Sequence, residues 1–306
     1  MSFFADNHSI MRWRSLSGIT CSVLLLVSLS RVGWAQDIES DSRIDWETNQ
    51  FAVELEARVT SSESRTAATV HRAQTRLDQE FPEALFAGLL PLPVDSRRVI
   101  EDAVRDDPDL ASRIARLARS AERSVPRPME DLRGVSRTYS VSLFPDLTQL
   151  FVNHRVPYQM ERVVRWVPTR EFTGIVIYAA ESLPLHGSET SSGTADHVQL
   201  VPALLPEIYD TNFRPVLEQD MIEPAAISRW GVAHYTDQTD PDAWRERAGT
   251  QPLRIMARRA FGIIPADVMI SPEDADRILA SPHNRNLLKE GRIVIIISPE
   301  QIDRIR

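Results

Sequence analysis

The sequence contains a single cysteine, Cys21, among its 306 residues. One thiol cannot form an intrachain disulfide, and it cannot supply the several thiolates of a Cys-rich zinc or iron–sulfur site. With 42% apolar and 25% charged residues, the composition is that of a globular protein. A chain of this length can form one large domain or two ordinary domains.

Lysine is almost absent as well. Lys289 is the only lysine among 35 basic residues, and the remainder are arginine. Arginine favours bidentate pairing with carboxylates, but we attribute the bias to genomic base composition rather than to function. The net charge is −8, so the basic surface that nucleic-acid binding needs is missing, and nucleic acid is excluded as a main partner.

The N-terminal apolar run, residues 19–29, is too short to cross a bilayer, which takes roughly 20 residues. Arg12 and Arg14 precede the run, and the small residues Gly33 and Ala35 follow it. A basic region, a short apolar region and small residues at −3 and −1 predict a signal peptide, residues 1–35, cleaved after Ala35. The alternative, a buried N-terminal helix, has no amphipathic pattern in its favour.

Cys21 lies inside the apolar run, whereas a lipoprotein carries its cysteine at the cleavage point. We therefore expect no lipid anchor, no integral membrane span in the mature chain and no cysteine after processing. Residues 1–35 contain three arginines and one aspartate, so their removal changes the net charge from −8 to −10. An acidic, exported chain without cysteine predicts a periplasmic protein of a double-membraned bacterium.

The first half of the mature chain, residues 36–158, is expected to be a small α+β domain with the order strand, helix, helix, strand. Residues 37–45 are polar and predict an exposed leader, and the alternation over 51–59 predicts a half-buried strand. A long helix follows, for which the serines of 61–64 offer N-caps and in which Pro82 should cause a kink or an end. Its apolar stripe is formed by Ala67, Val70, Ala73, Leu77, Phe81 and Leu85.

Two shorter helices are expected near residues 97–105 and 108–123, followed by a returning strand over 135–144 and a short helix over 145–151. The helix over 108–123 places its arginines on one side. That row could bind anions, although we interpret it as a solvated face. The arginines are Arg113, Arg116, Arg119 and Arg123.

The second half, residues 159–306, is expected to be a mixed-sheet α/β domain. Continuous apolar runs at 172–179 and 292–298 are typical of strands covered on both faces. Ser271 and Pro272 suit the N-cap and first position of a helix. The Gly-, Ser- and Thr-rich stretch 186–197 predicts a mobile surface loop. No repeat of 20–50 residues occurs, which excludes solenoids and propellers.

The sequence lacks the short motifs of serine hydrolases, zinc proteases, P-loop proteins, dinucleotide-binding folds and EF-hands. His186, Asp196 and His197 could ligate a metal, but a flexible loop gives ligands little support. Ser188 could act as a nucleophile if a histidine lay beside it. His234, in an expected strand, is interpreted as a packed or surface histidine.

Acidic pairs and tryptophans are the remaining candidates. The pairs Glu218/Asp220 and Asp240/Asp242 could serve acid–base chemistry, but turns or helix starts explain them more simply. Three tryptophans in the second half could line a binding groove, although we interpret them as packing residues. They are Trp166, Trp230 and Trp244. The sequence thus assigns no catalytic residue, no cofactor and no metal site.

The mature chain nevertheless resembles a known family. In the first half, Leu90–Ser96 and the strand Tyr139–Leu143 are similar to the small envelope lipoprotein domain of the flagellar basal-disc lipoproteins and their relatives. In the second half, five stretches look like the extension of longer periplasmic members. These are Phe172–Tyr178, Pro202–Asp210, Gly249–Arg254, Asp267–Ser271 and Gly291–Ile295.

The resemblance implies a non-enzymatic envelope protein, which in some family members is part of flagellar discs or rings. This chain departs from the family by lacking the lipid-bearing cysteine. We expect a periplasmic structural or assembly protein that associates with itself or with other envelope proteins and has a possible flagellar link. Two alternatives stay open: a binding module for a small ligand or cell-wall fragment, and a hydrolase with its site near the 186–197 loop.

Overall fold

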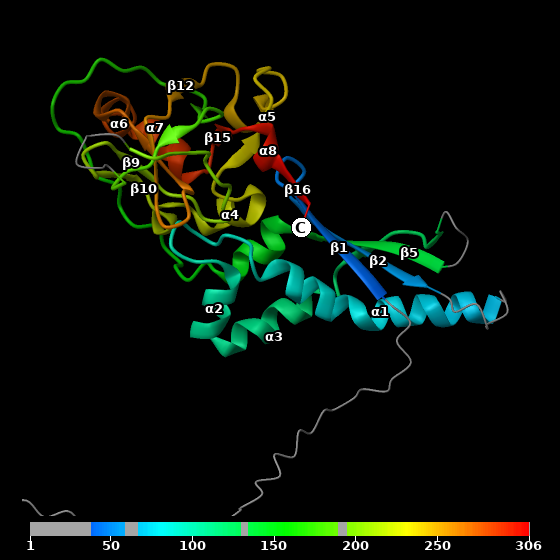
Figure 1. The fold of residues 1–306 in the computed structure, drawn as a ribbon. Coiled ribbons are helices and arrows are strands. Elements are labelled where there is room, and N and C mark those ends of the chain that lie inside the picture. The colour runs from blue at the N-terminus through cyan, green and yellow to red at the C-terminus, as the bar shows by residue number, and fades with distance from the viewer. Residues whose placement is uncertain (1–37, 59–66, 130–133, 189–194, 306) are drawn as a thin grey trace, which may run out of the picture. The chain divides into compact units, whose positions relative to one another are not determined.

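The computed structural model describes residues 38–58, 67–129, 134–188 and 195–305. Residues 36–306 belong to one compact unit, and its fold is α+β, as the sequence predicts (Figure 1). The expected signal peptide lies outside the described residues. None of the helices in the described segments has the length and apolar character needed to cross a membrane.

The first half consists of two long strands, three helices and a returning strand, with short pieces between them. Its elements are β1 (Ile38–Asp45), β2 (Gln50–Arg58), α1 (Ala67–Leu89), α2 (Ile100–Asp106), α3 (Pro108–Leu117), β3 (Glu122–Arg123), β4 (Arg127–Pro128), β5 (Gly134–Ser142) and the short helical turns η1 (Leu143–Leu147) and η2 (Thr148–Leu150).

The second half contains many short strands and five short helices. Its elements are β6 (Ile175–Tyr178), β7 (Leu183–Pro184), β8 (His197–Val198), β9 (Ile208–Asp210), β10 (Pro215–Leu217), η3 (Gln219–Met221), α4 (Pro224–Trp230), β11 (His234–Thr236), α5 (Arg245–Ala248), β12 (Leu253–Met256), β13 (Arg259–Phe261), β14 (Asp267–Ile270), α6 (Pro272–Leu279), α7 (Pro282–Lys289), β15 (Ile293–Ile296), α8 (Pro299–Ile302) and β16 (Asp303–Ile305).

An antiparallel sheet with the order β16-β1-β2-β5-β3 organises the first half, and β4 also pairs with β5. The expected exposed leader is in fact strand β1, so that prediction was wrong. It pairs with β2 along its whole length, from Ile38 opposite Ala57 to Asp45 opposite Gln50. Half of its side chains are exposed and only Ile44 is buried, which is why its sequence looks like a polar segment.

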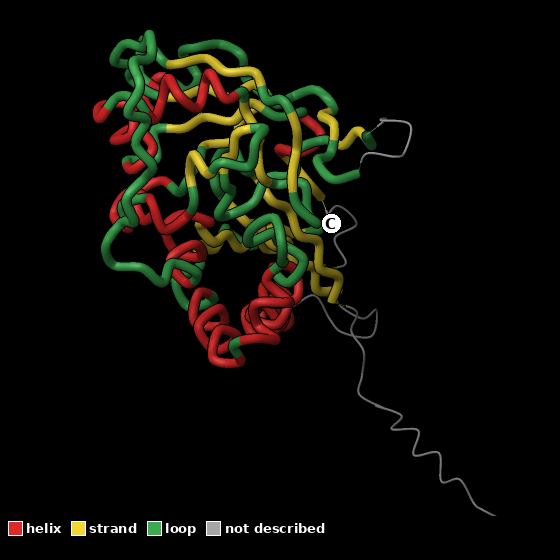
Figure 2. Tube along the Cα trace, turned by 90° about the vertical axis from the view of Figure 1, so that its left-hand side faces the viewer, coloured by secondary structure: helices red, strands yellow, loops and turns green. Residues whose placement is uncertain are grey.

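Helix α1 covers one face of this sheet, and α1, α2 and α3 lie on the same side of β1, β2 and β5 in Figure 1. Figure 2 shows the chain turned by 90°, with helices at its lower end beside the long strands and further helices above. The predicted stripe is buried at Leu77, Phe81 and Leu85. The Phe81 and Tyr139 rings stack with centroids 4.1 Å apart. The expected kink or end at Pro82 was wrong, because the helix continues to Leu89. Burial on both sides of the proline outweighs the loss of one backbone hydrogen bond.

Polar contacts connect α1 to the returning strand β5. The Tyr139 hydroxyl donates to Asp78 Oδ1 at 2.9 Å, and Arg137 Nη1 donates to the same oxygen at 3.0 Å. Burial and this hydrogen bond raise the pKa of Tyr139.

The expected arginine face over 108–123 was wrong in extent, because α3 ends at Leu117 and residues 122–123 form strand β3.

Two four-stranded sheets organise the second half. Strands β11-β15-β6-β12 are all parallel, and β10-β9-β14-β13 is mixed, with β9 and β14 parallel. The apolar runs predicted at 172–179 and 292–298 are the central strands β6 and β15. Val176 and Val294 pack with Trp244 and Ala248 on one face, while neighbouring residues enter the main core on the other. Burial on both faces explains why these strands do not alternate.

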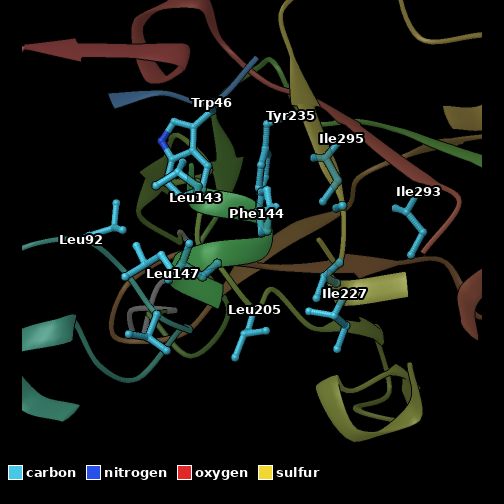
Figure 3. Close-up of a cluster of buried hydrophobic side chains, with 14 of the residues drawn as sticks. Trp46, Leu92, Leu143, Phe144, Leu147, Leu205, Ile227, Tyr235, Ile293 and Ile295 are labelled. Carbon is cyan, nitrogen blue, oxygen red and sulfur yellow. The ribbon is translucent and has the colours of Figure 1, made fainter. Parts of the chain in front are cut away.

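The two halves share a core and a boundary segment. Figure 3 shows Trp46 from the first half beside Tyr235 from β11, edge to face with ring centroids 5.5 Å apart. Residues 91–99 run against the second half, where Leu205 N donates to Val94 O at 2.8 Å and Ile264 N donates to Ser96 O at 3.0 Å. Strand β16 returns to the first sheet and pairs with β1. The first and the last strand of the described residues therefore lie in the same sheet.

Candidate functional site

A cavity of about 300 Å³ lies where α4 ends and β11 begins. Short helix α5 and the turn between β1 and β2 complete its wall. We call it the Trp230 pocket, and it is lined by Asn49, Arg229, Trp230, His234, Ala243, Trp244, Glu246 and Arg247.

The local sequence explains how the pocket is built. Pro224 occupies the first position of α4, and Gly231 ends the helix with a φ of 76°. A Cβ atom at Gly231 would lie 2.4 Å from the Phe144 ring, so this tight turn requires glycine. The chain then enters β11 at His234, which places the end of α4 and the start of β11 side by side.

Arg247 holds this corner together. Its Nη1 donates to Trp230 O at 2.5 Å and its Nη2 donates to Gly231 O at 2.9 Å. These are carbonyl groups at the C-terminus of α4, where backbone oxygens lack helical partners and a positive charge is favourable. Arg247 on α5 therefore caps α4 across a gap of 16 to 17 residues in the sequence.

The guanidinium of Arg247 is also an uncompensated buried charge. The residue is 6% exposed, and within the described part of the chain no carboxylate pairs with it and its Nε has no hydrogen-bond partner. Burial lowers the pKa of Arg247 to about 9, and the charges of Arg292 and Arg229 act in the same direction. Buried cations are normally paired with carboxylates, whereas this guanidinium is held by the two backbone carbonyls of Trp230 and Gly231.

Three guanidinium groups gather around the Trp230 ring. The Cζ atoms of Arg229, Arg247 and Arg292 lie 4.5, 4.6 and 5.6 Å from its centroid, within the range of cation–π attraction. Of these three arginines, only Arg292 forms an ion pair with a described residue, namely Glu290, at 3.1 Å. The pocket thus has an excess of positive charge, in a chain whose net charge is −8.

His234 adds an uncharged polar group to the pocket. Burial, together with the smaller effect of the Arg247 charge, lowers its pKa to about 4. The imidazole is therefore neutral at pH 7, with one nitrogen able to donate a hydrogen bond and the other able to accept one. Trp244, on the same wall, is buried, and its Nε1 donates to Gln238 O at 3.2 Å.

A second hollow has a volume of about 390 Å³. Arg254 connects the two, since it lines the second hollow while its Cζ lies 5.8 Å from the ring of Trp244. Arg170 and Arg277 lie over the ring of Phe172. We call this the Phe172 hollow, and it is lined by Arg170, Phe172, Thr250, Gln251, Pro252, Leu253, Arg254 and Arg277.

The candidates near the 186–197 loop do not come together as a site. His186 packs against Phe213 and Phe261 at 5.0 and 6.1 Å between ring centroids. The Ser188 hydroxyl donates to Leu185 O and accepts from Asp196 N, both at 2.9 Å. Within the described residues, no group of three or more His, Cys, Asp or Glu side chains is placed to hold a metal. Residues 189–194 lie outside the described part.

His197 and the Asp240/Asp242 pair occupy ordinary surface positions. A ring nitrogen of His197 lies 3.2 Å from Ala195 O. Asp240 Oδ1 accepts from Asp242 N at 3.0 Å in a turn, as the simpler interpretation predicts. Burial and the charges of Glu207 and Asp220 raise the pKa of Glu218.

The three tryptophans have three different environments. Trp244 is buried, as the packing interpretation predicts, and Trp230 is half-buried and lines the pocket. Trp166 is 86% exposed, so packing was the wrong interpretation for it. Sequence reasoning considered a binding groove for Trp230 and Trp244 but favoured packing, interpreted His234 as a packed or surface histidine, and missed Arg247, whose contacts depend on the turn at Gly231. A Trp-Gly pair at the end of a helix was the only local signal.

Two family models match the chain. Residues 37–150 match the N-terminal domain of Treponema pallidum Tp0624, and residues 174–299 match the second domain of the same protein. No curated protein matches the chain. The two matches follow one another in the order of the named domains and together cover most of the chain. The Trp230 pocket, apart from Asn49, lies within the second match. Over residues 37–150 and 174–299 the chain is therefore similar to two consecutive domains of Treponema pallidum Tp0624, the N-terminal domain and the second domain.

Proposed function

We propose that the chain is an exported, non-enzymatic binding module that holds a small anionic ligand in the Trp230 pocket. The observation that carries the proposal is the buried guanidinium of Arg247, which has no carboxylate partner in the described part of the chain. A carboxylate or phosphate bound there would supply the missing counter-charge. The pocket also has the shape and the few convergent polar groups of a ligand site.

The lining residues suggest how an anion would be bound. The Arg247 Nε–H group is unused among the described contacts. Arg229 is exposed at the pocket wall and forms no ion pair with a described residue. Neutral His234 can donate one hydrogen bond without adding a charge. Because Arg247 is already fixed by the Trp230 and Gly231 carbonyls, little conformational entropy is lost when the ligand binds.

Export to the periplasm is part of this proposal. It is supported by the signal-peptide pattern of residues 1–35 and by the compact unit, which begins at Gln36, directly after the expected cleavage site. Expression of the full chain in a double-membraned bacterium should yield a mature protein beginning at Gln36 in the periplasmic fraction. N-terminal sequencing of the fractionated protein tests this, and an unprocessed chain in the cytoplasm would contradict it.

Binding itself can be tested with inorganic phosphate as the probe. Titration of residues 36–306, followed by calorimetry and by tryptophan fluorescence, should show saturable binding. Arg229→Gln should weaken it about tenfold, a loss consistent with one charge-assisted hydrogen bond. Arg119→Gln removes an equally exposed arginine outside the pocket and should have no effect. Binding that is unaffected by Arg229→Gln would refute the proposal.

The structure offers the hydrolase alternative no supporting geometry among the described residues, since the Ser188 hydroxyl contacts backbone and His186 contacts phenylalanines. The assembly alternative has one specific observation in its favour. Residues 156–167, which we call the strap, form no helix or strand but display exposed apolar side chains. These are Val156, Tyr158, Val164 and Trp166.

The strap is held in place rather than loose. Tyr158 N donates to Asp220 O at 2.7 Å, Met160 is buried, and Arg165 pairs with Asp276. A fixed backbone that presents Val164 and Trp166 to solvent is typical of a protein contact surface. We therefore propose self-association through the strap as a second candidate function. An association with flagellar structures belongs to this candidate, and it rests on the sequence resemblance alone.

Light scattering after size exclusion over a concentration series tests self-association. The mature chain should form concentration-dependent oligomers, and the double variant Val164→Ser/Trp166→Ser should shift them to monomers. Val125→Ser is the control, because Val125 is 80% exposed on the other half of the chain. A strict monomer at all concentrations would remove this candidate and leave the binding module.

A further inference from the structure

The Trp230 pocket and the Phe172 hollow are linked by a short segment of fixed conformation. Residues 249–252 follow α5, which lines the pocket, and lead into β12, which lines the hollow. Thr173 anchors this segment: its Oγ1 donates to Ala248 O at 2.7 Å and accepts from Gln251 N at 2.9 Å. Its backbone N–H also donates to Gln251 O at 3.1 Å. The spacing between the two cavities is therefore set before any ligand binds.

Positive charge continues from one cavity to the other. Six arginines line the cavities or lie against their aromatic residues, and among the described residues only Arg277 and Arg292 form ion pairs, with Asp274 and Glu290. The six are Arg170, Arg229, Arg247, Arg254, Arg277 and Arg292. Glu246 is the acidic residue on the pocket wall. This part of the chain is locally cationic although the chain as a whole is acidic. Such a local charge favours the binding of a negatively charged ligand.

The aromatic rings of the two cavities are already engaged by arginine. Guanidinium groups lie 4.5 and 4.6 Å from the Trp230 centroid and 5.2 and 5.7 Å from the Phe172 centroid. Rings occupied in this way are poor platforms for stacking a base or an aromatic ligand. Planar guanidinium forks held by stacking are instead well placed for bidentate bonds to phosphate or carboxylate groups.

We infer that the two cavities form one extended site for a linear polyanion, a chain carrying repeated phosphate or carboxylate groups without aromatic rings. One anionic group occupies the Trp230 pocket and another occupies the Phe172 hollow, with Arg254 between them. This inference rests on the proposed function, because it takes the Trp230 pocket as the first of the two subsites. It adds the class of ligand and a second set of contact residues.

The two subsites can be tested separately with residues 36–306. Inorganic phosphate can occupy only one cavity at a time, and the part of its binding that Arg229→Gln weakens reports the Trp230 pocket, whereas linear polyphosphate probes both cavities at once. Polyphosphate should bind at least about tenfold more tightly, because the second contact is intramolecular once the first has formed. The double variant Arg170→Gln/Arg254→Gln alters two exposed residues of the hollow. It should remove most of this gain and leave the phosphate binding that depends on Arg229 within about twofold.

Each result separates the inference from the proposed function. Phosphate binding that is insensitive to Arg229→Gln contradicts the proposed function, whatever polyphosphate does. Phosphate binding that depends on Arg229, together with polyphosphate binding that is indifferent to Arg170→Gln/Arg254→Gln, overturns only the extended site. Arg119→Gln serves as the matched control in both series.

Two further probes define the ligand class. Oligogalacturonate carries repeated carboxylates, and its binding relative to polyphosphate distinguishes acidic glycans from phosphate chains, either of which supports the inference. A single-stranded oligonucleotide of equal charge should bind more weakly than polyphosphate, because its bases find no free ring face. Tighter binding of the oligonucleotide would overturn the assignment to a non-aromatic polyanion.

Discussion

Arg247 contacts Trp230 in two ways at once. Its Nη1 donates a 2.5 Å hydrogen bond to the Trp230 carbonyl oxygen, and its Cζ lies 4.6 Å from the centroid of the same residue's indole ring. The side chain that caps α4 therefore also positions the ring at the pocket wall. Because one guanidinium performs both tasks, the stability of this corner and the geometry of the pocket are coupled.

The first prediction concerns this cap. Arg247→Met should lower the free energy of unfolding by about 2 kcal/mol, because the carbonyls of Trp230 and Gly231 lose their donors. Relief of a buried charge offsets part of the loss, which keeps the expected value moderate. Urea unfolding of residues 36–306 measures it, with Arg119→Met as an exposed control expected within about 0.5 kcal/mol of the parent. Unchanged stability would show that the cap contributes nothing.

The second prediction concerns Asp267, a buried carboxyl group on β14. Its pKa is raised from 3.8 to about 7, mainly by burial. The nearby charges of Glu207 and Asp95 also raise the pKa, whereas the hydrogen bond from the Glu207 amide lowers it. Between pH 4 and 7 the folded chain keeps a proton that the unfolded chain releases. Stability should therefore fall as pH rises through this window, by up to about 1.4 kcal/mol per pH unit.

Asp267→Asn removes the titrating group and should flatten this dependence. The comparison is the urea midpoint of the parent and the variant between pH 5 and 8. Asp240→Asn, at an exposed turn, keeps the same backbone hydrogen-bond acceptor and should follow the parent curve. Parallel curves for the parent and Asp267→Asn would mean that Asp267 does not titrate in this range.

A structural feature could be predicted from the sequence when the contacts that form it lie between residues close together in the chain. The N-cap at Ser271 and the buried strands β6 and β15 are indicated by patterns of neighbouring residues, and they were predicted correctly. Strand β1 was missed because half of its side chains are exposed and its pairing with β2 and β16 defines it. The pocket could not be predicted for a similar reason, since Arg247 meets Trp230 only after the turn at Gly231 has formed.

The third prediction uses the N-cap that local sequence does reveal. Ser271 Oγ accepts from Asp274 N at 3.1 Å and donates to Asp274 Oδ2 at 2.9 Å. Ser271→Ala should cost about 1 kcal/mol of unfolding free energy, and Ser271→Asp should recover part of the hydrogen bonding but place two carboxylates together. Urea unfolding ranks the three proteins, and equal stability of the parent and Ser271→Ala would contradict the capping role.

The last prediction concerns Pro82, which lies inside α1 without ending it. A proline at this position has no N–H to donate to the carbonyl of Asp78, and its ring crowds that carbonyl. The helix persists because Phe81 and Leu85, on either side, are buried in the core. Pro82→Ala restores the donor and removes the crowding, so it should raise the free energy of unfolding by about 1–3 kcal/mol.

Glu83→Ala is the matched control for Pro82→Ala, because it changes the next, exposed residue of the same helix and should alter stability by less than about 0.5 kcal/mol. Urea unfolding compares both variants with the parent. A loss of stability in Pro82→Ala would show that packing of the partly buried proline ring outweighs the missing hydrogen bond. In that case α1 would be held at this point by side-chain contacts rather than by its backbone.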